Sequence, residues 1–180
     1  VTGKFGHAVS LDGTGDYINL GNSSLFDLNQ LTIAAWIKVI NFDLQWQTII
    51  SKGLNTWRLH RAYVSGNGLD FYINTSGSTY CRSSEVNDGQ WHHVAAVKDS
   101  DGLKIYLDGI LDAEKVLSAT IQTNTEPVWI GSNSESTNRW WEGLIDEVAI
   151  YDHALSQQEV SRIVAYGITG TPDETLVGYW

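Results

Sequence analysis

Short segments in which apolar and polar residues alternate recur along almost the whole chain. The segments LTIAAWIKV (31–39) and LDFYIN (69–74) show this pattern most clearly, and HHVAAVK (92–98) and LKIYLDG (103–109) continue it. Because successive side chains of a β-strand point to opposite faces, a period of two predicts strands that are buried on one side. Turn sequences such as SKGLN, SGNG and VNDGQ separate these segments. The chain is therefore expected to be all-β.

Two local patterns complete this prediction. KIYLDGILDA indicates a tight hairpin across Asp108 and Gly109, because glycine adopts the positive φ that such turns require. The segment near 156–166 has a helical pattern, with Ser156 as the N-cap and Glu159 at the capping-box position. Many short strands, frequent turns and one short helix together predict a two-sheet antiparallel β-sandwich.

The composition fits a single domain that spans residues 1–180. Apolar residues make up 42% of the chain, and eight Trp and eight Tyr supply much of the area that can be buried. The single cysteine, Cys81, excludes an internal disulfide. A formal net charge of −10 argues against nucleic acid as a partner, since phosphates require clustered Lys and Arg. No run approaches the ~20 apolar residues of a membrane span, so membrane insertion is not expected.

Several motifs in a fixed order resemble a known family. GKFGHAVSLDGTGDYINLG, LTIAAWIKV, DGQWHHVAAVKD, LKIYLDGIL and WWEGLIDEVAIYDHALSQQEV are similar to laminin G-like domains of the concanavalin A-like lectin/glucanase superfamily. The last motif also resembles the corresponding stretch of pentraxins. The resemblance implies a two-sheet jelly roll, a frequent calcium site, and a role as a carbohydrate- or protein-binding module of extracellular proteins. Such modules are often appended to bacterial polysaccharide-degrading enzymes.

The C-terminal segment 172–180 departs from the family order. A strand resembling LVGYW usually precedes the GKFG segment in this family, whereas here it comes last. Two interpretations are open. The strand either docks in its usual place from the C-terminal side, which nearby sandwich termini would allow, or belongs to a following repeat. Docking is favoured, because a free LVGYW strand would expose an apolar edge.

The stretch GLIDEVAIYD places two carboxylates, Asp146 and Glu147, side by side in an apolar run. Neighbouring side chains of a strand point to opposite faces, so these two are not expected to act on one glycosidic bond. A glycosidase needs its two carboxyls ~5–9.5 Å apart in one site. The E-x-D-x-x-E pattern of the superfamily's glucanases is also missing. The sequence therefore predicts no catalytic pair here.

A charge among apolar neighbours needs a partner, and calcium is one solution. LDGTGDY places Asp12 and Asp16 beside glycines whose carbonyl groups can also reach an ion. The family resemblance places this segment near the strand that carries Asp146. A structural calcium site of Asp12, Asp16 and Asp146 is therefore predicted. The alternative is an ordinary acidic turn and an Asp146 that accepts backbone N–H bonds.

Two other features could indicate catalysis. The adjacent His92 and His93 face opposite ways in a strand, and no accompanying pattern supports zinc, so core packing is favoured. RSSE (82–85) and QWH (90–92) superficially resemble the R-x-E and Q-x-H strands of alginate lyases. However, the first spacing is one residue too long, and the Y-x-K-x-G-x-Y strand is missing. A lyase or hydrolase is thus the least favoured reading, and the chain is not expected to be an enzyme.

The remaining candidate is a polar and aromatic surface across three successive strands. If Leu59, Phe71 and Ile73 face the core, their neighbours point outward, where aromatic faces stack on sugars and polar groups bind hydroxyls or carboxylates. The predicted ligand-binding residues on these strands are Arg58, His60, Tyr72, Asn74, Tyr80 and Arg82. The predicted loop contributors are Trp46, Arg139 and Trp140, with Trp141 assigned to the core. The alternative is a solvated face with arginines extended over it.

The sequence therefore predicts a non-catalytic carbohydrate-binding module with structural calcium. It is expected to serve a secreted polysaccharide-active enzyme or a surface protein, as part of a larger multidomain protein. The local gathering of arginines indicates an anionic or strongly hydrogen-bonding glycan. The main alternative is a protein–protein interaction or adhesion domain.

Overall fold

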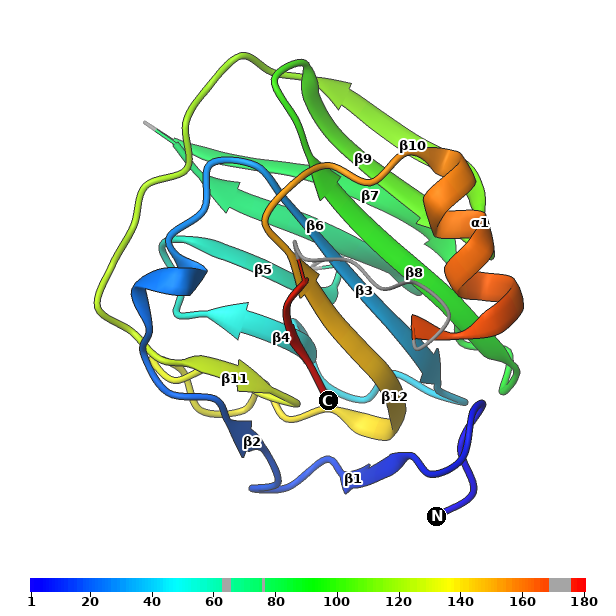
Figure 1. Ribbon diagram of the computed structural model, residues 1–180. Coiled ribbons are helices and arrows are strands. Elements are labelled where there is room, and N and C mark those ends of the chain that lie inside the picture. Colours follow the sequence, from blue (N-terminus) through cyan, green and yellow to red (C-terminus); the bar gives the residue numbers. More distant parts are fainter. Residues whose placement is uncertain (63–65, 76, 169–175) are drawn as a thin grey trace.

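The computed structural model describes residues 1–62, 66–75, 77–168 and 176–180. Its strands form two antiparallel sheets that pack face to face, and an α-helix lies on the outside of one of them (Figure 1). This arrangement confirms the predicted two-sheet β-sandwich with one short helix. Within the described ranges, no helix is long and apolar enough to cross a membrane.

Each sheet has a simple strand order. The six-stranded sheet runs β2-β11-β4-β5-β6-β7, and the seven-stranded sheet runs β1-β12-β3-β8-β9-β10, with β13 also paired to β12. The strands of the six-stranded sheet are β2 (Ile18–Asn19), β11 (Val128–Ile130), β4 (Thr48–Lys52), β5 (Trp57–Arg61), β6 (Gly68–Asn74) and β7 (Ser78–Glu85). Those of the seven-stranded sheet are β1 (Val9–Asp12), β12 (Glu142–Tyr151), β3 (Leu31–Lys38), β8 (Trp91–Lys98), β9 (Gly102–Leu107), β10 (Ile110–Val116) and β13 (Leu176–Tyr179). A short 3-10 helix, η1 (Ser24–Phe26), precedes β3.

The space between the sheets is filled by the side chains that the alternation assigns to the interior. Leu31, Ile33 and Ile37 of β3 are fully buried and meet Leu59 and Phe71 of the opposite sheet in one apolar cluster. The clustering follows from the pleat, because residues two apart on a strand share a face. Burial of this apolar area is the main stabilising contribution to the sandwich.

The outer face of the seven-stranded sheet is covered by a second apolar layer. Helix α1 (Gln157–Tyr166) packs Val160 and Ile163 over Ala34, Ala95 and Tyr151 of the sheet. The helix begins with the predicted capping box: the Ser156 hydroxyl accepts from the Glu159 N–H, and the Glu159 carboxylate accepts from the Ser156 N–H. Helix α1 therefore covers part of the outer face of the seven-stranded sheet with apolar contacts.

Strand β12 contains a β-bulge at the two adjacent acids. Ile145 and Val148 both belong to the apolar cluster between the sheets, so Asp146 and Glu147 both lie on the outer side. Glu147 has a φ of 51°, the left-handed conformation that such a bulge uses. The expectation that these two side chains point to opposite faces is therefore wrong, because the regular pleat is interrupted between them.

Both carboxylates are engaged by different backbone segments. Asp146 accepts hydrogen bonds from the N–H groups of Phe5 (3.0 Å) and Glu147 (2.9 Å). Glu147 accepts from the N–H of Ile168 (2.8 Å) and from the hydroxyl of Tyr179 in β13. The adjacent acids thus hold the N-terminal segment and the C-terminal strand against β12. Of the segment 172–180, the described part, Leu176–Tyr179, docks as an antiparallel strand, while 172–175 lies outside the described residues.

Candidate functional site

The outer face of the six-stranded sheet gathers polar and aromatic side chains from β5, β6 and β7. In the strand register Arg58 lies opposite Tyr72, and Tyr72 lies opposite Tyr80. His60 lies opposite Asp70, which in turn lies opposite Arg82. These two parallel rows place five of the predicted residues on one face of the sheet, where His60 and Tyr72 are themselves buried. The sixth, Asn74, also lies on β6, but its amide N–H groups already bond to Asn55 O (3.2 Å) and Gln122 Oε1 (3.0 Å).

Asp70 is a site residue that the sequence reading did not select. Its carboxylate accepts two hydrogen bonds from Arg82, at 2.7 Å from Nε and 3.0 Å from Nη2. This bidentate bond raises the pKa of Arg82 and fixes the guanidinium in place. The alternation in LDFYIN puts Asp70 in phase with Tyr72, and that phase was the signal that could have identified it. The charge of Arg82 is therefore balanced inside the protein.

Arg58 is held over an aromatic ring instead of a carboxylate. Its guanidinium carbon lies 3.5 Å from the centre of the Tyr72 ring, and its Nη1 donates to the carbonyl oxygen of Leu54. Burial lowers the pKa of Arg58 to about 10. The Nε of Arg58 is buried without a hydrogen-bond partner. Arg58 is thus a rigid cation with donor capacity left over.

His60 is almost completely buried, with 3% of its surface exposed. Its Nδ1 lies 2.7 Å from the carbonyl oxygen of Arg61, which can only accept, so Nδ1 carries the proton. Burial, together with the nearby charge of Arg58, lowers the pKa of His60 to about 3. The ring is therefore neutral, and its Nε2 is a buried acceptor without a partner. The sequence predicted His60 as a ligand-binding residue, whereas the structure encloses its ring.

Two loops build a wall beside this face. The loop 131–140 lies along β4: Thr48 N–H donates to Arg139 O (2.9 Å), and Asn133 Nδ2 donates to Ser51 Oγ (3.1 Å). The loop 41–47 approaches it from the other side, where the Arg139 guanidinium lies 4.9 Å from the centre of a Trp46 ring. Two of the three predicted loop residues, Trp46 and Arg139, therefore contact each other beside β4.

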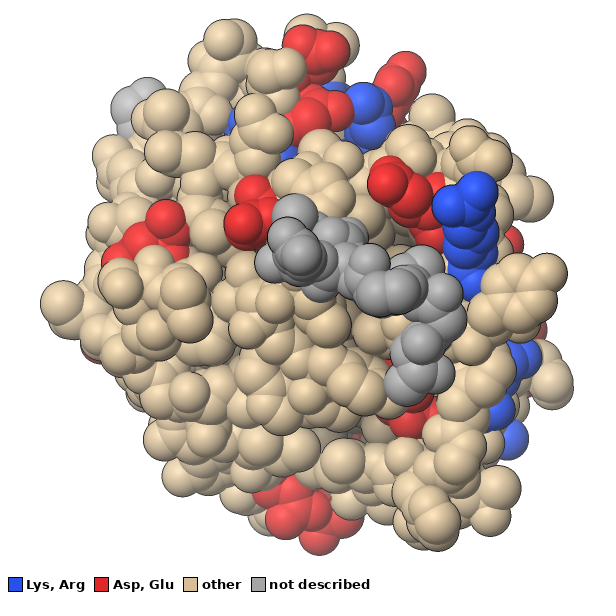
Figure 2. All heavy atoms as spheres, viewed as in Figure 1, with Lys and Arg blue, Asp and Glu red and all other residues tan. Residues whose placement is uncertain are grey.

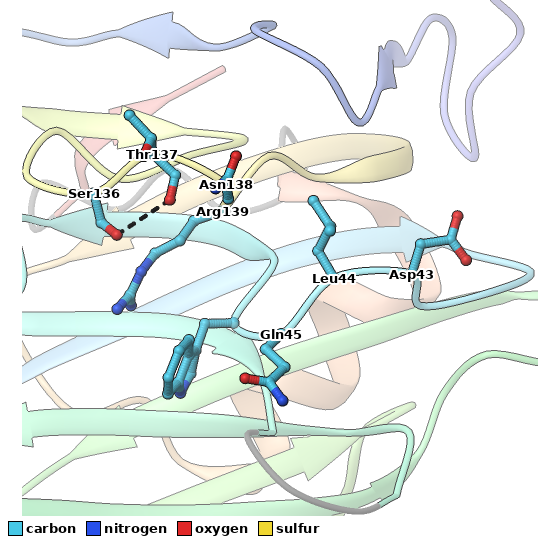
Figure 3. A pocket seen from close by; sticks show the side chains of 8 residues that line it. Asp43, Leu44, Gln45, Ser136, Thr137, Asn138 and Arg139 are labelled. Atoms are coloured by element: carbon cyan, nitrogen blue, oxygen red, sulfur yellow. Dashed lines mark hydrogen bonds between the residues drawn. The ribbon is translucent and has the colours of Figure 1, made fainter.

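Between these loops lies a hollow of about 420 Å³, lined by residues 43–46 and 136–139 (Figure 3). Arg139 extends into it, while Asp43 lies at the far end and points away (Figure 3). Trp46 (φ 56°) and Asn138 (φ 64°) both adopt the left-handed conformation, which is uncommon for residues other than glycine. Such conformations cost energy and concentrate at ligand-binding sites. The hollow is thus a preformed feature of the two loops.

An aromatic group borders the other side of the loop 131–140. Tyr17 stacks on Trp129 with ring centres 3.9 Å apart, and Trp140 lies 6.1 Å from Tyr17. Trp129 and Trp140 line a second hollow of about 290 Å³. Trp140 is partly exposed and Trp141 is fully buried, as their assignment from the sequence required. Tyr17 and Trp129 were not selected, although the alternation in VWI already turns Trp129 outward.

The three predicted calcium ligands are not brought together. Where β1 pairs with β12, Asp12 lies opposite Glu142. Glu142 is four residues from Asp146, a distance of roughly 13 Å along the strand. Both carboxylate oxygens of Asp146 accept backbone N–H bonds. Asp12 accepts from Thr14 N–H, and Asp16 accepts from Asp12 N–H, as in an acidic turn. Across the described part of the chain, no three His, Cys, Asp or Glu side chains form a metal-binding group.

The two adjacent histidines have different surroundings. The Nδ1 and Nε2 of His92 lie 2.9 Å from Asp108 and 3.1 Å from Asp88. His93 is fully buried with its ring centre 5.3 Å from that of Trp36, and neither of its ring nitrogens has a hydrogen-bond partner. Core packing was expected for both histidines; it is confirmed for His93, whereas His92 is partly exposed. His93 lies on the helix-covered side of the molecule, away from the candidate site.

The sandwich and its polar, aromatic outer face define a lectin-like class of jelly rolls. A laminin G-type family model of the concanavalin A-like lectin/glucanases superfamily matches residues 12–161. The chain therefore belongs to this superfamily, as its motifs indicated. A search of curated proteins gave no match.

Solved structures with the same fold include carbohydrate-binding domains. Domain 4 of AbnA, an extracellular GH43 arabinanase of Geobacillus stearothermophilus, was solved in complex with arabinotriose; it is 25% identical, with a TM-score of 0.73 over 91% of this chain and 79% of that one. The CBM40 of a Ruminococcus gnavus IT-sialidase is 18% identical, with a TM-score of 0.72 over 88% and 95%. A SAP-like pentraxin of Limulus polyphemus is 20% identical, with a TM-score of 0.63 over 89% and 83%. The fold is thus of a lectin or binding type.

Proposed function

We propose that the chain is a non-catalytic carbohydrate-binding module whose ligand lies on the outer face of the six-stranded sheet. The observation that carries this proposal is the convergence of Arg58, His60, Tyr72, Tyr80 and Arg82 on that one face. Support also comes from domain 4 of the arabinanase, which shares the fold and was solved with a bound oligosaccharide.

The mechanism is equilibrium binding through stacking and hydrogen bonds. Tyr80 has 45% of its surface exposed and offers a ring face to a sugar. Arg58 and Arg82 are held in place by Tyr72 and Asp70, so they lose little side-chain entropy when they donate to ligand hydroxyls. Binding by one copy is expected to be weak, and several modules in one protein would raise the overall affinity.

The proposal also states where the protein acts and which metal ion it binds. A secreted or surface protein that acts on polysaccharides is the expected parent, in line with the extracellular arabinanase that carries a domain of this fold. Calcium at the turn of Asp12 and Asp16 is also retained as a prediction. These carboxylates lie beside glycine carbonyl groups, a donor set that suits calcium, but they would need further oxygen ligands from the backbone or water.

A panel of neutral and acidic polysaccharides, screened by affinity electrophoresis and isothermal titration calorimetry, tests the proposal. Tyr80→Ala should weaken binding about tenfold or more, the effect of losing one aromatic contact of roughly 1.5 kcal/mol. Tyr166→Ala is the control, because Tyr166 is an even more exposed tyrosine that lies on α1, away from the candidate site. The proposal fails if the folded protein binds no glycan, or if both variants bind like the parent.

A protein partner is the second candidate, and the edge strand β10 favours it. Ile110, Leu111 and Val116 on this strand have 68%, 38% and 90% of their surfaces exposed. An edge strand with exposed apolar side chains can pair with a strand of another protein. Binding that survives enzymatic deglycosylation of the partner and is lost in Leu111→Lys would support this function.

A further inference from the structure

Two arginines at the candidate site have no acidic partner. The chain has 21 Asp and Glu residues and a net charge of −10, yet Arg58 and Arg139 form no ion pair with any described residue. The nearby Arg82 differs, since Asp70 binds it through two hydrogen bonds. Acidic side chains also occur in separate groups on the face that carries α1 and β12 (Figure 2). Other described cations also lack an ion pair, so it is the partial burial of these two guanidinium groups that requires an explanation.

The two guanidinium groups belong to one local environment. The carbonyl oxygen of Arg139 accepts from Thr48 N–H, and Thr48 is the register partner of His60, two residues after Arg58 on β5. Arg139 extends from its loop into the hollow beside this strand, where Asp43 points away from it (Figure 3). The Asp43 carboxylate instead accepts a hydrogen bond from Asn41 (2.5 Å). No carboxylate among the residues that line this hollow neutralises Arg139.

Both arginines are partly removed from water and keep unused donors. The Nε of Arg58 and the Nε and Nη1 of Arg139 are buried without a hydrogen-bond partner among the residues that the structure describes. Burial lowers the pKa of both side chains, and the charge of Arg139 contributes to the lowering at Arg58. A partly buried guanidinium without a counter-ion destabilises the free protein, so an anion that binds there recovers this cost.

The histidine on the strand of Arg58 adds no charge to this environment. The ring of His60 is 3% exposed and stays neutral at physiological pH, with a pKa of about 3. The positive charge beside this strand therefore comes from the guanidinium groups and not from a protonated imidazole.

We propose that Arg58 and Arg139 bind the carboxylate of an acidic saccharide. The planar guanidinium groups match the two oxygens of a carboxylate, the group that a uronic acid residue carries. This inference rests on the proposed carbohydrate-binding function and names the class of its ligand.

Matched acidic and neutral polymers test the inference. Sodium polygalacturonate and sodium alginate are compared with their carboxyl-reduced forms by affinity electrophoresis and calorimetry in the same buffer. At least one acidic polymer should bind about tenfold or more tightly than its reduced form, the gain expected from charge-assisted hydrogen bonds. Arg139→Gln and Arg58→Gln should each remove this preference, whereas Arg162→Gln, an exposed arginine on α1, should retain it.

The outcomes separate this inference from the function on which it rests. Binding of neutral glycans with no preference for the acidic forms would overturn the carboxylate site and leave the module a carbohydrate binder. No binding to any glycan by folded protein would overturn both. A sulfated polymer that binds more tightly than either uronate would also overturn the carboxylate assignment. Because Arg58→Gln loses its contact with Tyr72, melting temperatures accompany every variant, and the loop variant Arg139→Gln decides the result if Arg58→Gln does not fold.

Discussion

Tyr179, next to the last residue of the chain, donates its hydroxyl hydrogen to the carboxylate of Glu147 in the middle of β12. The same carboxylate accepts from the N–H of Ile168, just after α1. Burial and this contact raise the pKa of Tyr179 to about 12. One acid in a bulge therefore joins a central strand, the segment after the helix and the C-terminal strand.

Glu147→Gln should destabilise the protein by about 1–3 kcal/mol, because the two donors reach different oxygens of the carboxylate and an amide places an oxygen at only one of these positions. The measurement is equilibrium unfolding in urea. Tyr179→Phe, which removes the partner hydroxyl, should cost less than Glu147→Gln. Unfolding free energies equal to that of the parent in both variants would show that the contact does not hold β13 in place.

His93 should make the fold sensitive to acid. Burial lowers the pKa of His93 to about 4, below the ordinary value of 6.5, so the unfolded chain binds a proton that the folded protein excludes. Its stabilising contribution is complete above pH 6.5 and is lost as the pH falls from 6.5 to about 4, a change on the order of 3 kcal/mol. His93→Phe should remove this part of the pH dependence. It should change stability little at pH 7, because neither ring nitrogen has a partner to lose.

His92 supplies a control of opposite sign for this experiment. Although its partial burial acts in the other direction, hydrogen bonds to Asp108 and Asp88 raise the pKa of His92. Its contribution is therefore present below pH 6.5 and is lost as the pH rises through the folded value. Urea unfolding between pH 4 and 8 should show His92→Asn and His93→Phe altering the pH profile in opposite directions. Parallel profiles for the parent and His93→Phe would contradict the assignment.

The Asp70–Arg82 pair should show measurable coupling. Arg82 is about one third exposed, so solvent screens the pair and a coupling of only about 0.5–1 kcal/mol is expected. A double-mutant cycle of Asp70→Asn and Arg82→Gln, followed by urea unfolding, measures this energy. Arg82→Gln alone should cost more than the double variant, because it leaves the buried carboxylate of Asp70 without its partner. Strictly additive effects would mean that the pair contributes nothing.

Calcium should raise the melting temperature of chelator-treated protein. Glu142 lies opposite Asp12, and the neighbouring Asp43 and Asp12 raise the pKa of Glu142, so a divalent cation would relieve carboxylate repulsion at this end of the sandwich. A ligand that binds only the folded state stabilises it according to its concentration over Kd. Asp12→Asn should abolish the calcium effect, and Asp146→Asn, at the far end of the register, should retain it. An unchanged melting temperature at millimolar calcium would remove the metal from the proposed function.

Local signals were sufficient for much of the fold. The alternation on β3 and β6 and the capping box at Ser156 depend on neighbours in sequence, and both appear where they were expected. The bulge at Asp146 and Glu147 could not be predicted in this way, since it depends on contacts with Phe5, Ile168 and Tyr179. Alternation rules assume a regular pleat, and tertiary contacts interrupted it here.

In the candidate site, too, local sequence patterns predicted some features and tertiary contacts determined the others. The alternation of side chains along β5, β6 and β7 correctly placed Arg58, Tyr72 and Tyr80 on one face of the sheet. The pairing of Asp70 with Arg82 depends on which residues lie opposite each other across strands, and a single sequence does not specify that register. The burial of His60 could not be foreseen either, because residues that surround it come from a loop more than seventy positions later in the chain.

Helix α1 and its apolar cluster cover the outer side of the seven-stranded sheet, while the outer side of the six-stranded sheet carries arginines, tyrosines and two loops. Side chains on this second surface contribute little to either apolar layer. The exposed side chains of this surface, such as Tyr80, and those of residues 43–46 and 136–139 can therefore change without altering either apolar layer. Proteins that share this fold can in this way acquire new ligand preferences by a few substitutions, while the residues of the two apolar layers stay the same.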